Sequence, residues 1–309
     1  MSIREFFSLL ALVVAGVSYS GSAAAACSIT TGNADFGSRT SIVVNTTAQR
    51  TTSDNSFSCS GGLFSFFTSG NRLSSTPTSA NNFRLTNSNG YAVAYDIYTN
   101  SDYATGRWQQ GQQNSSNFFN LLSRLTPNTG TFKLYFQTRT GANVPEGIYR
   151  DTVSVRWTWH ICTAGVLFCV AYEDGSATTT INVVLTVVKS CLINAAPDID
   201  FGTSAFVGGF NPVNQNVNLT CTLRQPYRTF FTDGGNYDGT WKRMAQGANF
   251  LQYNLFIAGG GTAWDKNNKQ SGTGSGTAQS LPYTARINSA QPDQPAGAYT
   301  DNVSITVEY

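Results

Sequence analysis

The stretch Thr178-Thr-Thr-Ile-Asn-Val-Val-Leu-Thr-Val-Val-Lys189 decides the fold of this chain. Every second residue from Ile181 to Val187 is apolar, a period that is typical of a β-strand buried on at least one face. The stretch occurs once, whereas most of the sequence around it occurs twice. The functional prediction depends on this difference between the two copies.

Two segments repeat the same motifs in the same order, which indicates two diverged copies of one domain. Copy one opens with Cys27 and continues to Asp35-Phe-Gly37. Copy two opens with Cys191 and continues to Asp200-Phe-Gly202. A possible further pair is Trp108 and Trp264, which favours a shared structural role for these two tryptophans.

Length and composition agree with two β-domains. A chain of 309 residues suits two domains of roughly 150 residues, and we place them at 27–189 and 190–309. Only 12% of the residues are charged, and the strand candidates are short, with turn residues between them and no helical period. The sequence therefore predicts an all-β protein of two tandem immunoglobulin-like antiparallel β-sandwiches, the second lacking its final strand.

Each copy has a strand with the motif Gly-x-Tyr-x-Asp-x-Val, which starts at Gly147 in copy one and at Gly297 in copy two. Copy one then continues to the strand 178–189, whereas copy two reaches Tyr309 without such a strand. A sandwich that lacks a strand exposes a groove of core side chains and unpaired backbone groups. The residues that we predict to line this donor-strand groove share one face of the last strand: Tyr299, Val303, Ile305, Val307 and Tyr309.

The missing strand matters energetically. Four inward aliphatic side chains amount to about 6–12 kcal/mol of gross burial, at roughly 1.5–3 kcal/mol each, and a whole domain is stable by only about 5–15 kcal/mol. We therefore expect another subunit to supply a strand to copy two by strand addition to an open sheet edge. If the mature chain begins at Cys27, it has no extension to lend, which predicts a place at one end of a head-to-tail fibre.

The N-terminal residues predict export. Arg4 gives a weakly basic start, residues 6–17 are apolar but too short to span a bilayer, and four alanines precede Cys27. This pattern is typical of a secretory signal peptide, here residues 1–26. An acylated lipoprotein cysteine at Cys27 is the alternative. We expect passage through the periplasm to the cell surface, where disulfides are stable.

The six cysteines form an even set, which agrees with disulfides in an exported protein. Cys27 and Cys59 are 32 residues apart, and Cys191 and Cys221 are 30 apart. Such matched spacing predicts one equivalent link in each copy, worth about 3–4 kcal/mol in the loop-entropy account. The third predicted disulfide joins the two cysteines without counterparts, Cys162 and Cys169.

The Cys27-Ser-Ile opening, the Asp-Phe-Gly motif and the ending Gly297-Ala-Tyr-Thr-Asp-Asn-Val-Ser-Ile-Thr-Val-Glu-Tyr309 resemble the spore coat protein U domain family, the pilins of archaic (Csu-type) chaperone–usher pili. The two-domain layout resembles the tip adhesin of such a pilus, whereas ordinary stalk subunits have one domain and a donor extension. The resemblance implies three partners, which are a periplasmic chaperone, an outer-membrane usher and an adjacent pilin that donates a strand. It also implies a role in attachment and biofilm formation.

Strand direction predicts which loops of copy one face away from copy two. Because the strand 178–189 runs into the domain linker, the connections 59–63, 99–131 and 160–177 are expected at the distal end. These loops look like the hydrophobic loops of tip adhesins and predict contact with an abiotic or host surface; a cap on the domain's own core is the alternative for the loop between Cys162 and Cys169. The predicted contact residues are apolar: Leu63, Phe64, Phe118, Phe119, Leu121, Leu122, Val166, Leu167 and Phe168. Shortly after the first connection, Phe66-Phe67 matches Phe230-Phe231, which predicts core positions.

Other functions have weaker support in the sequence. The single His160 has no nucleophile or acid that the sequence places beside it, so we expect no enzyme, cofactor or metal. The net charge of +2 is spread without a basic run, which argues against a nucleic-acid partner. Two alternatives remain open. One is a lectin-like subunit with Tyr103 and Trp108 as a sugar platform, and the other is a secreted structural coat or fibre subunit.

Overall fold

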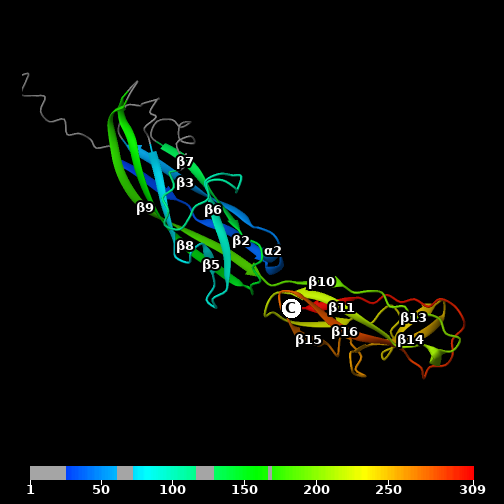
Figure 1. Ribbon diagram of the computed structural model, residues 1–309. Helices are drawn as coiled ribbons and strands as arrows, with labels where there is room; N and C mark the ends of the chain where they lie inside the picture. Colours follow the sequence, from blue (N-terminus) through cyan, green and yellow to red (C-terminus); the bar gives the residue numbers. More distant parts are fainter. Residues whose placement is uncertain (1–25, 61–71, 116–128, 166–168) are drawn as a thin grey trace, which may run out of the picture.

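The computed structural model describes residues 26–60, 72–115, 129–165 and 169–309. Within these ranges nearly every regular element is a β-strand, and the strands form two bodies that lie end to end (Figure 1). β1 to β9 build the first body and β10 to β17 build the second. No helix in the described part of the chain is long and apolar enough to cross a membrane. The predicted signal peptide lies outside the described residues, apart from Ala26.

The described residues of the first body contain nine strands and one short helix. Their bounds in chain order are β1 Ala26–Thr31, β2 Ala34–Thr40, α2 Ser41–Thr46, β3 Arg50–Ser60, β4 Arg72–Ser79, β5 Arg84–Thr86, β6 Ala92–Tyr98, β7 Thr129–Thr138, β8 Gly147–Gly165 and β9 Cys169–Val188.

The strands of the first body follow the path β1-β3-β7-β6-β5-β8-β9-β2, and β4 pairs with β8. The path turns at the short strand β5, which pairs with β8 only through Thr86 and Arg150. One layer therefore contains β1, β3, β7 and β6, and the other contains β4, β8, β9 and β2. Both layers contribute buried residues to one apolar core, as expected for a β-sandwich.

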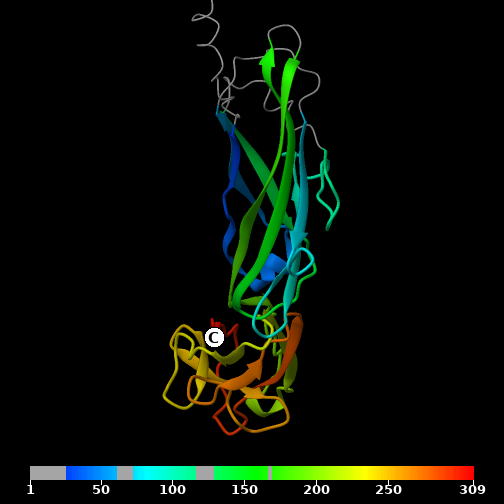
Figure 2. The ribbon, with the colours of Figure 1, turned by 90° about the vertical axis from the view of Figure 1, so that its left-hand side faces the viewer.

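β9 closes the first body. It pairs antiparallel with β8 and parallel with β2, and its residues Ile181, Val183 and Leu185 are fully buried. The prediction of a buried strand here is confirmed. β9 begins earlier than the predicted stretch, at Cys169, because its outer half pairs with β8 in a long hairpin that extends away from the second body (Figure 2).

The second body has its own core and two sheets. Its elements are β10 Cys191–Ala195, η1 Val207–Gly209, β11 Val213–Cys221, β12 Pro226–Phe231, β13 Lys242–Gln246, β14 Asn249–Ile257, β15 Gln270–Thr273, β16 Ala278–Ile287 and β17 Ile305–Glu308. One sheet has the order β10-β11-β16-β14-β13 and the other the order β15-β12-β17. Their inward residues form a separate apolar cluster. The all-β prediction of two sandwiches, the second lacking its final strand, is therefore confirmed.

The shared motifs make the same turns in both copies. The amide of Gly37 donates to Asp35 Oδ1 over 2.7 Å, and the amide of Gly202 donates to Asp200 Oδ1 over 2.8 Å. Both glycines have positive φ, +70° and +74°, a conformation that a side chain disfavours. The Asp-Phe-Gly motif is therefore a local side-chain-to-backbone turn.

The tyrosine of the Gly-x-Tyr-x-Asp-x-Val motif also has a local role. Tyr149 OH donates to the carbonyl of Pro145 over 2.8 Å, and Tyr299 OH donates to the carbonyl of Pro295 over 2.7 Å. Each bond spans four residues and fixes the entry into the strand, as a tyrosine corner does in immunoglobulin-like sandwiches.

The tryptophan pair has the predicted structural role. Trp108 and Trp264 are buried, and their amides donate to the carbonyls of Ile97 and Leu255. The two bonds measure 2.8 and 2.7 Å. Trp108 therefore belongs to the core and is not available as a sugar platform.

The match of Phe66-Phe67 to Phe230-Phe231 is wrong as a structural equivalence. In β12 the residue opposite Ile305 is Phe231, and in β4 the residue opposite Val155 is Pro77. β12 is therefore the counterpart of β4, because each pairs with the strand of the Gly-x-Tyr-x-Asp-x-Val motif. Residues 66 and 67 lie outside the described residues.

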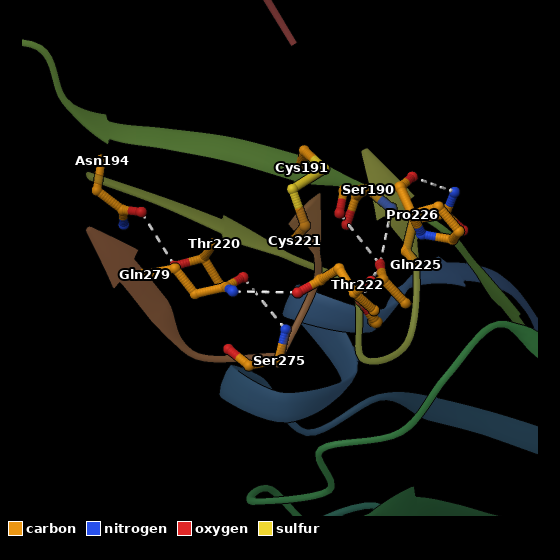
Figure 3. The surroundings of a disulfide bond; sticks show 12 residues. Ser190, Cys191, Asn194, Thr220, Cys221, Thr222, Gln225, Pro226, Ser275 and Gln279 are labelled. Atoms are coloured by element: carbon orange, nitrogen blue, oxygen red, sulfur yellow. Dashed lines mark hydrogen bonds between the residues drawn. A yellow bond between two sulfur atoms is a disulfide. The ribbon is translucent and has the colours of Figure 1, made fainter. Parts of the chain in front are cut away.

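One predicted disulfide is present in full, between Cys191 and Cys221 (Figure 3). Cys27 is also disulfide-bonded, and the strand register places it opposite Cys59, just as Cys191 lies opposite Cys221. Cys169 is disulfide-bonded as well. The side chains of Cys59 and Cys162 lie outside the described ones.

Candidate functional site

The strand of the Gly-x-Tyr-x-Asp-x-Val motif is covered in copy one and open in copy two. In β8, Val153 and Val155 are fully buried. Their counterparts Val303 and Ile305 are only half-buried, although they pack against the core of the second body. The difference follows from β9, which pairs with β8 along its length.

The backbone shows the same asymmetry. β8 pairs with β4 on one side and with β9 on the other. β17 pairs with β12 on one side, and no strand of the described residues 190–309 pairs with its other side. Such an edge presents free N–H and C=O groups that can bind a further strand.

The Asp-Phe-Gly segment forms the opposite wall of this opening. In copy one it lies within β2, which pairs with β9, and Phe36 is buried. In copy two the equivalent segment forms no strand, and Ile199 and Phe201 are half-buried. The open groove therefore lies between Phe201 and β17, at the place that β9 fills in copy one. Its half-buried apolar residues are Ile199, Phe201, Tyr299, Val303, Ile305 and Val307.

Of the predicted groove residues, Tyr299, Val303, Ile305 and Val307 are half-buried and Tyr309 is exposed. Sequence reasoning missed Ile199 and Phe201. The repeated Asp-Phe-Gly motif was a signal for them, because the same segment of copy one lies beside the closing strand.

An acid holds each motif strand to its neighbours; Asp151 is buried and Asp301 is half-buried. Asp151 Oδ2 accepts from Tyr95 OH over 2.7 Å and from Ser79 Oγ over 2.6 Å. Asp301 Oδ2 accepts from Tyr253 OH over 2.8 Å. Burial, together with the neighbouring carboxylate, raises the pKa of both Tyr95 and Tyr253. These recurring acids therefore have structural roles.

The hairpin of β8 and β9 carries exposed apolar side chains at the distal end of copy one. Val170 is 67% exposed and Tyr172 is 44% exposed. Tyr172 stacks on His160 with 4.2 Å between the ring centres, and His160 Nδ1 lies 2.7 Å from Asp174 Oδ1. These contacts define the distal hairpin surface, residues 169–174. The lone histidine thus has two structural neighbours.

The strands that flank the predicted contact loops end near this hairpin. The register places the start of β4 at Arg72 opposite His160, and it places the start of β7 at Thr129 opposite Ser58, near the end of β3. The predicted contact residues themselves lie outside the described residues: Leu63, Phe64, Phe118, Phe119, Leu121, Leu122, Val166, Leu167 and Phe168. Val170 and Tyr172 are exposed apolar residues at this end that sequence reasoning missed, although Val170 directly follows Cys169, the last residue of the predicted disulfide loop.

A second aromatic group lies on the outer face of β6 and β7. Tyr103 packs edge-on against Tyr98 and Tyr135, with ring centres 6.1 and 5.7 Å apart. The Arg50 guanidinium lies 4.3 Å from the Tyr103 ring centre. An adjacent cavity of about 450 Å³ is lined by the polar side chains of Asp54, Asn100, Asp102 and Lys133, among others. In the described residues, no group of three His, Cys, Asp or Glu side chains could hold a metal ion.

The described residues thus form two β-sandwiches in tandem, one closed by its own strand β9 and one whose strand β17 has an unpaired edge. The chain belongs to the Spore Coat Protein U domain family, whose model matches residues 14–156 and 177–306. No curated protein matches this chain.

Among solved structures, the chain resembles one from the chaperone–tip adhesion subunit pre-assembly complex CsuC–CsuE of the archaic chaperone–usher Csu pili of Acinetobacter baumannii. The TM-score is 0.59 at 20% identity, with 92% of this chain and 100% of that chain covered. A weaker likeness is to CfaE, the adhesive subunit of CFA/I fimbria of enterotoxigenic Escherichia coli, with a TM-score of 0.34, 10% identity and coverage of 76% and 81%. The first likeness supports the fold of both bodies.

Proposed function

We propose that this chain is the tip adhesin subunit of an archaic chaperone–usher pilus. Copy two accepts a donor strand from the adjacent pilin, and copy one mediates attachment to surfaces and biofilm formation through its distal apolar loops. The observation that carries the proposal is the open groove between Phe201 and β17 in copy two. In copy one, β9 fills the equivalent groove.

β9 supplies the template for the donor strand. The donor pairs antiparallel with β17 and lies parallel to the Asp-Phe-Gly segment, as β9 does with β8 and β2. In that register its apolar residues take the places of Ile181, Val183 and Leu185, which are fully buried in copy one. Backbone hydrogen bonds give such a strand its affinity, and the alternating side chains give it specificity.

The closed groove of copy one supports the terminal position. Because β9 already occupies it, copy one accepts no donor strand, and copy two holds the acceptor groove for a further subunit. Before assembly the open groove needs a substitute strand, which a periplasmic chaperone supplies, and the outer-membrane usher then exchanges it for the donor. This sequence of partners requires export, in agreement with the predicted signal peptide of residues 1–26.

The distal hairpin surface supports adhesion. Val170 and Tyr172 are exposed, and exposed apolar side chains of this kind mark contact surfaces. The residues 166–168, which precede them in the sequence, are apolar as well. We expect the loops 61–71 and 116–128 to add further apolar residues to the same end, since β3 ends there and β4 and β7 begin there.

The test of adhesion replaces Val166, Leu167 and Phe168 with Ser, Asn and Ser in the full chain on cells. Attachment to hydrophobic plastic should fall by tenfold or more, because three apolar side chains contribute roughly 1.5–3 kcal/mol each when buried. The number of fibres should not change, since the groove of copy two is untouched. Unchanged attachment by normally piliated cells contradicts the proposed role of Val166, Leu167 and Phe168 in adhesion.

A glycan-binding tip subunit is the second candidate. The tyrosine group of Tyr98, Tyr103 and Tyr135 lies beside the polar cavity, and aromatic faces next to amides and carboxylates suit a sugar. A glycan array, read against attachment to hydrophobic and hydrophilic beads, separates the two candidates. Binding to one glycan class that is lost in Tyr103→Ala favours the lectin.

A further inference from the structure

The junction between the two bodies is short and tightly bonded. Only two residues, Lys189 and Ser190, separate β9 from β10. Ser41, at the start of α2, lies 2.6 Å from Thr222 through buried side-chain oxygens. Thr222 Oγ1 donates to the carbonyl of Ser190 over 3.1 Å and accepts from its amide over 2.8 Å, so Ser41 is the donor to Thr222. Figure 3 shows Thr222 beside the disulfide, next to the ribbon of α2.

A glycine-rich turn of copy two adds to the junction. The sequence predicts a flexible turn over 272–276, but Asn143 Nδ2 donates to the carbonyl of Ser275 over 2.9 Å. The backbone of Gly274 also bonds to Arg224 and Gln225. Copy two therefore covers the near end of copy one at several points, among them Ser41 and Asn143.

Copy two has positions that match Ser41 and Asn143 in the sequence. They lie at its far end, where nothing in the described structure covers them. Phe206 follows Gly202 by four residues, as Ser41 follows Gly37, and Asp293 precedes Pro295 by two residues, as Asn143 precedes Pro145. The two are neighbours, because the amide of Val207 donates to Asp293 Oδ1 over 2.8 Å. In Figure 1 the orange-red loop that contains Asp293 lies at the end away from the first body.

Phe206 is unusually exposed. Its side chain is 69% accessible, the highest value for a large apolar residue in the described part of the chain. Ser41, which lies at the same distance from its motif glycine, is buried, with 6% accessible, because copy two lies on it. An aromatic side chain at a position that is an interdomain contact in the other copy indicates a surface that becomes covered on assembly.

We propose that Phe206 and Asp293 form the docking surface for the β-domain of the adjacent pilin, the same subunit whose strand fills the groove. The inference rests on the proposed function and extends it. In copy one, the strand that fills the groove leads through two residues into the domain that covers Ser41. A donor strand that runs in the same direction through copy two leaves its own domain over Phe206.

The partner surface follows from the internal junction. There, the residue directly after the second cysteine of copy two, Thr222, contacts Ser41. We therefore expect Phe206 to contact the stretch that follows the second cysteine of the adjacent pilin. Because phenylalanine replaces serine, that contact is apolar and does not depend on a hydroxyl pair.

Photo-crosslinking in assembled fibres tests this placement. The full chain is produced on cells with p-benzoylphenylalanine in place of Phe206 or, separately, in place of Tyr309 at the end of the groove strand. Fibres are sheared off and irradiated, and the crosslinked peptides are identified by mass spectrometry. Both positions should capture the same pilin, Tyr309 through its donor strand and Phe206 through the stretch after its second cysteine.

The outcomes separate the docking surface from the groove. One outcome is a crosslink from position 309 to a donor strand, while position 206 gives no crosslink or a crosslink to a different segment. This outcome overturns the docking surface and leaves the groove intact. The absence of any donor-strand crosslink from 309 overturns the proposed function as well. As a second measurement, Phe206→Ser should shorten the lifetime of the tip on sheared fibres in denaturant by about tenfold. Ile148→Ser, an exposed position of copy one, should not; equal lifetimes for both variants contradict the proposal.

Discussion

At the residue scale, the buried carboxylate of Asp151 binds β8 to neighbouring segments of copy one. It accepts from Tyr95, Ser79 and the amides of Asn81 and Thr152. Asp151→Asn replaces one carboxylate oxygen by an NH2 group. This group cannot accept a hydrogen bond, so at least one of the donors to Asp151 loses its partner. We expect a loss of about 1–3 kcal/mol in the free energy of unfolding, the usual cost of an unsatisfied buried polar group.

The matched substitution Asp301→Asn in copy two should cost less, because Asp301 is half-buried and two of its backbone donors, Gly235 and Asn302, are exposed. Urea unfolding of the two full-length variants measures both values. Equal losses for the two positions contradict the view that the groove of copy two is open to water.

The buried tyrosines predict alkaline instability. Burial raises the pKa of Tyr95 and Tyr253, and it raises that of Tyr149 to about 12. The folded state therefore holds these protons more tightly than the unfolded state, whose tyrosines titrate near 10. The stabilisation is complete below pH 10 and is lost as the pH rises toward the folded pKa values.

The free energy of unfolding, measured by urea titration between pH 8 and 11.5, should stay level and then fall above pH 10. Each raised tyrosine contributes about 1.4 kcal/mol per pH unit to the slope. Tyr95→Phe should make the slope shallower by one such contribution. A slope that is unchanged in this variant argues against Tyr95 as a source.

At the element scale, β8 and β17 have the same motif and different surroundings. Asn in place of Val155, which is fully buried beneath β9, should destabilise the free chain by about 2–5 kcal/mol. Ile305→Asn should cost the free chain much less, because Ile305 is already half-exposed. It should instead abolish incorporation into fibres, since the donor strand would have to bury the amide.

Unfolding curves and immunoblots of sheared fibres give the two readouts. Normal incorporation of the Ile305→Asn chain contradicts the groove. Normal stability of the Val155→Asn chain contradicts the equivalence of the two strands.

Individual elements were predictable where the sequence has a period or repeats a motif. The alternation from Ile181 to Val187 indicated a buried strand, and the repeated Gly-x-Tyr-x-Asp-x-Val motif indicated β17. The Phe66-Phe67 match was misleading about equivalent positions, because strand pairing places Phe231 opposite Ile305 and Pro77 opposite Val155. The long hairpin was not predictable, since its outer half is polar and its stability comes from pairing with β8.

At the scale of the whole molecule, the repeat predicted two tandem sandwiches, and the groove within copy two could be inferred from the strand that copy two lacks. The junction could not be predicted, because Ser41, Asn143 and Thr222 are ordinary polar residues that come together only in three dimensions. The role of Phe206 could not be predicted either, because its exposure becomes informative only when it is compared with the burial of Ser41 in the structure.

The central claim is that copy two has an unfilled place for a strand. Hydrogen exchange of the full chain, with and without a peptide of the sequence Thr178–Lys189, tests it most directly. We predict slowed exchange on peptide binding in β17 and in residues 199–203, with no change in β8. A control peptide with serine at the positions of Ile181, Val183 and Leu185 should have no effect. Exchange in β17 that is already as slow as in β8 without peptide, or that does not respond to the peptide, contradicts the claim.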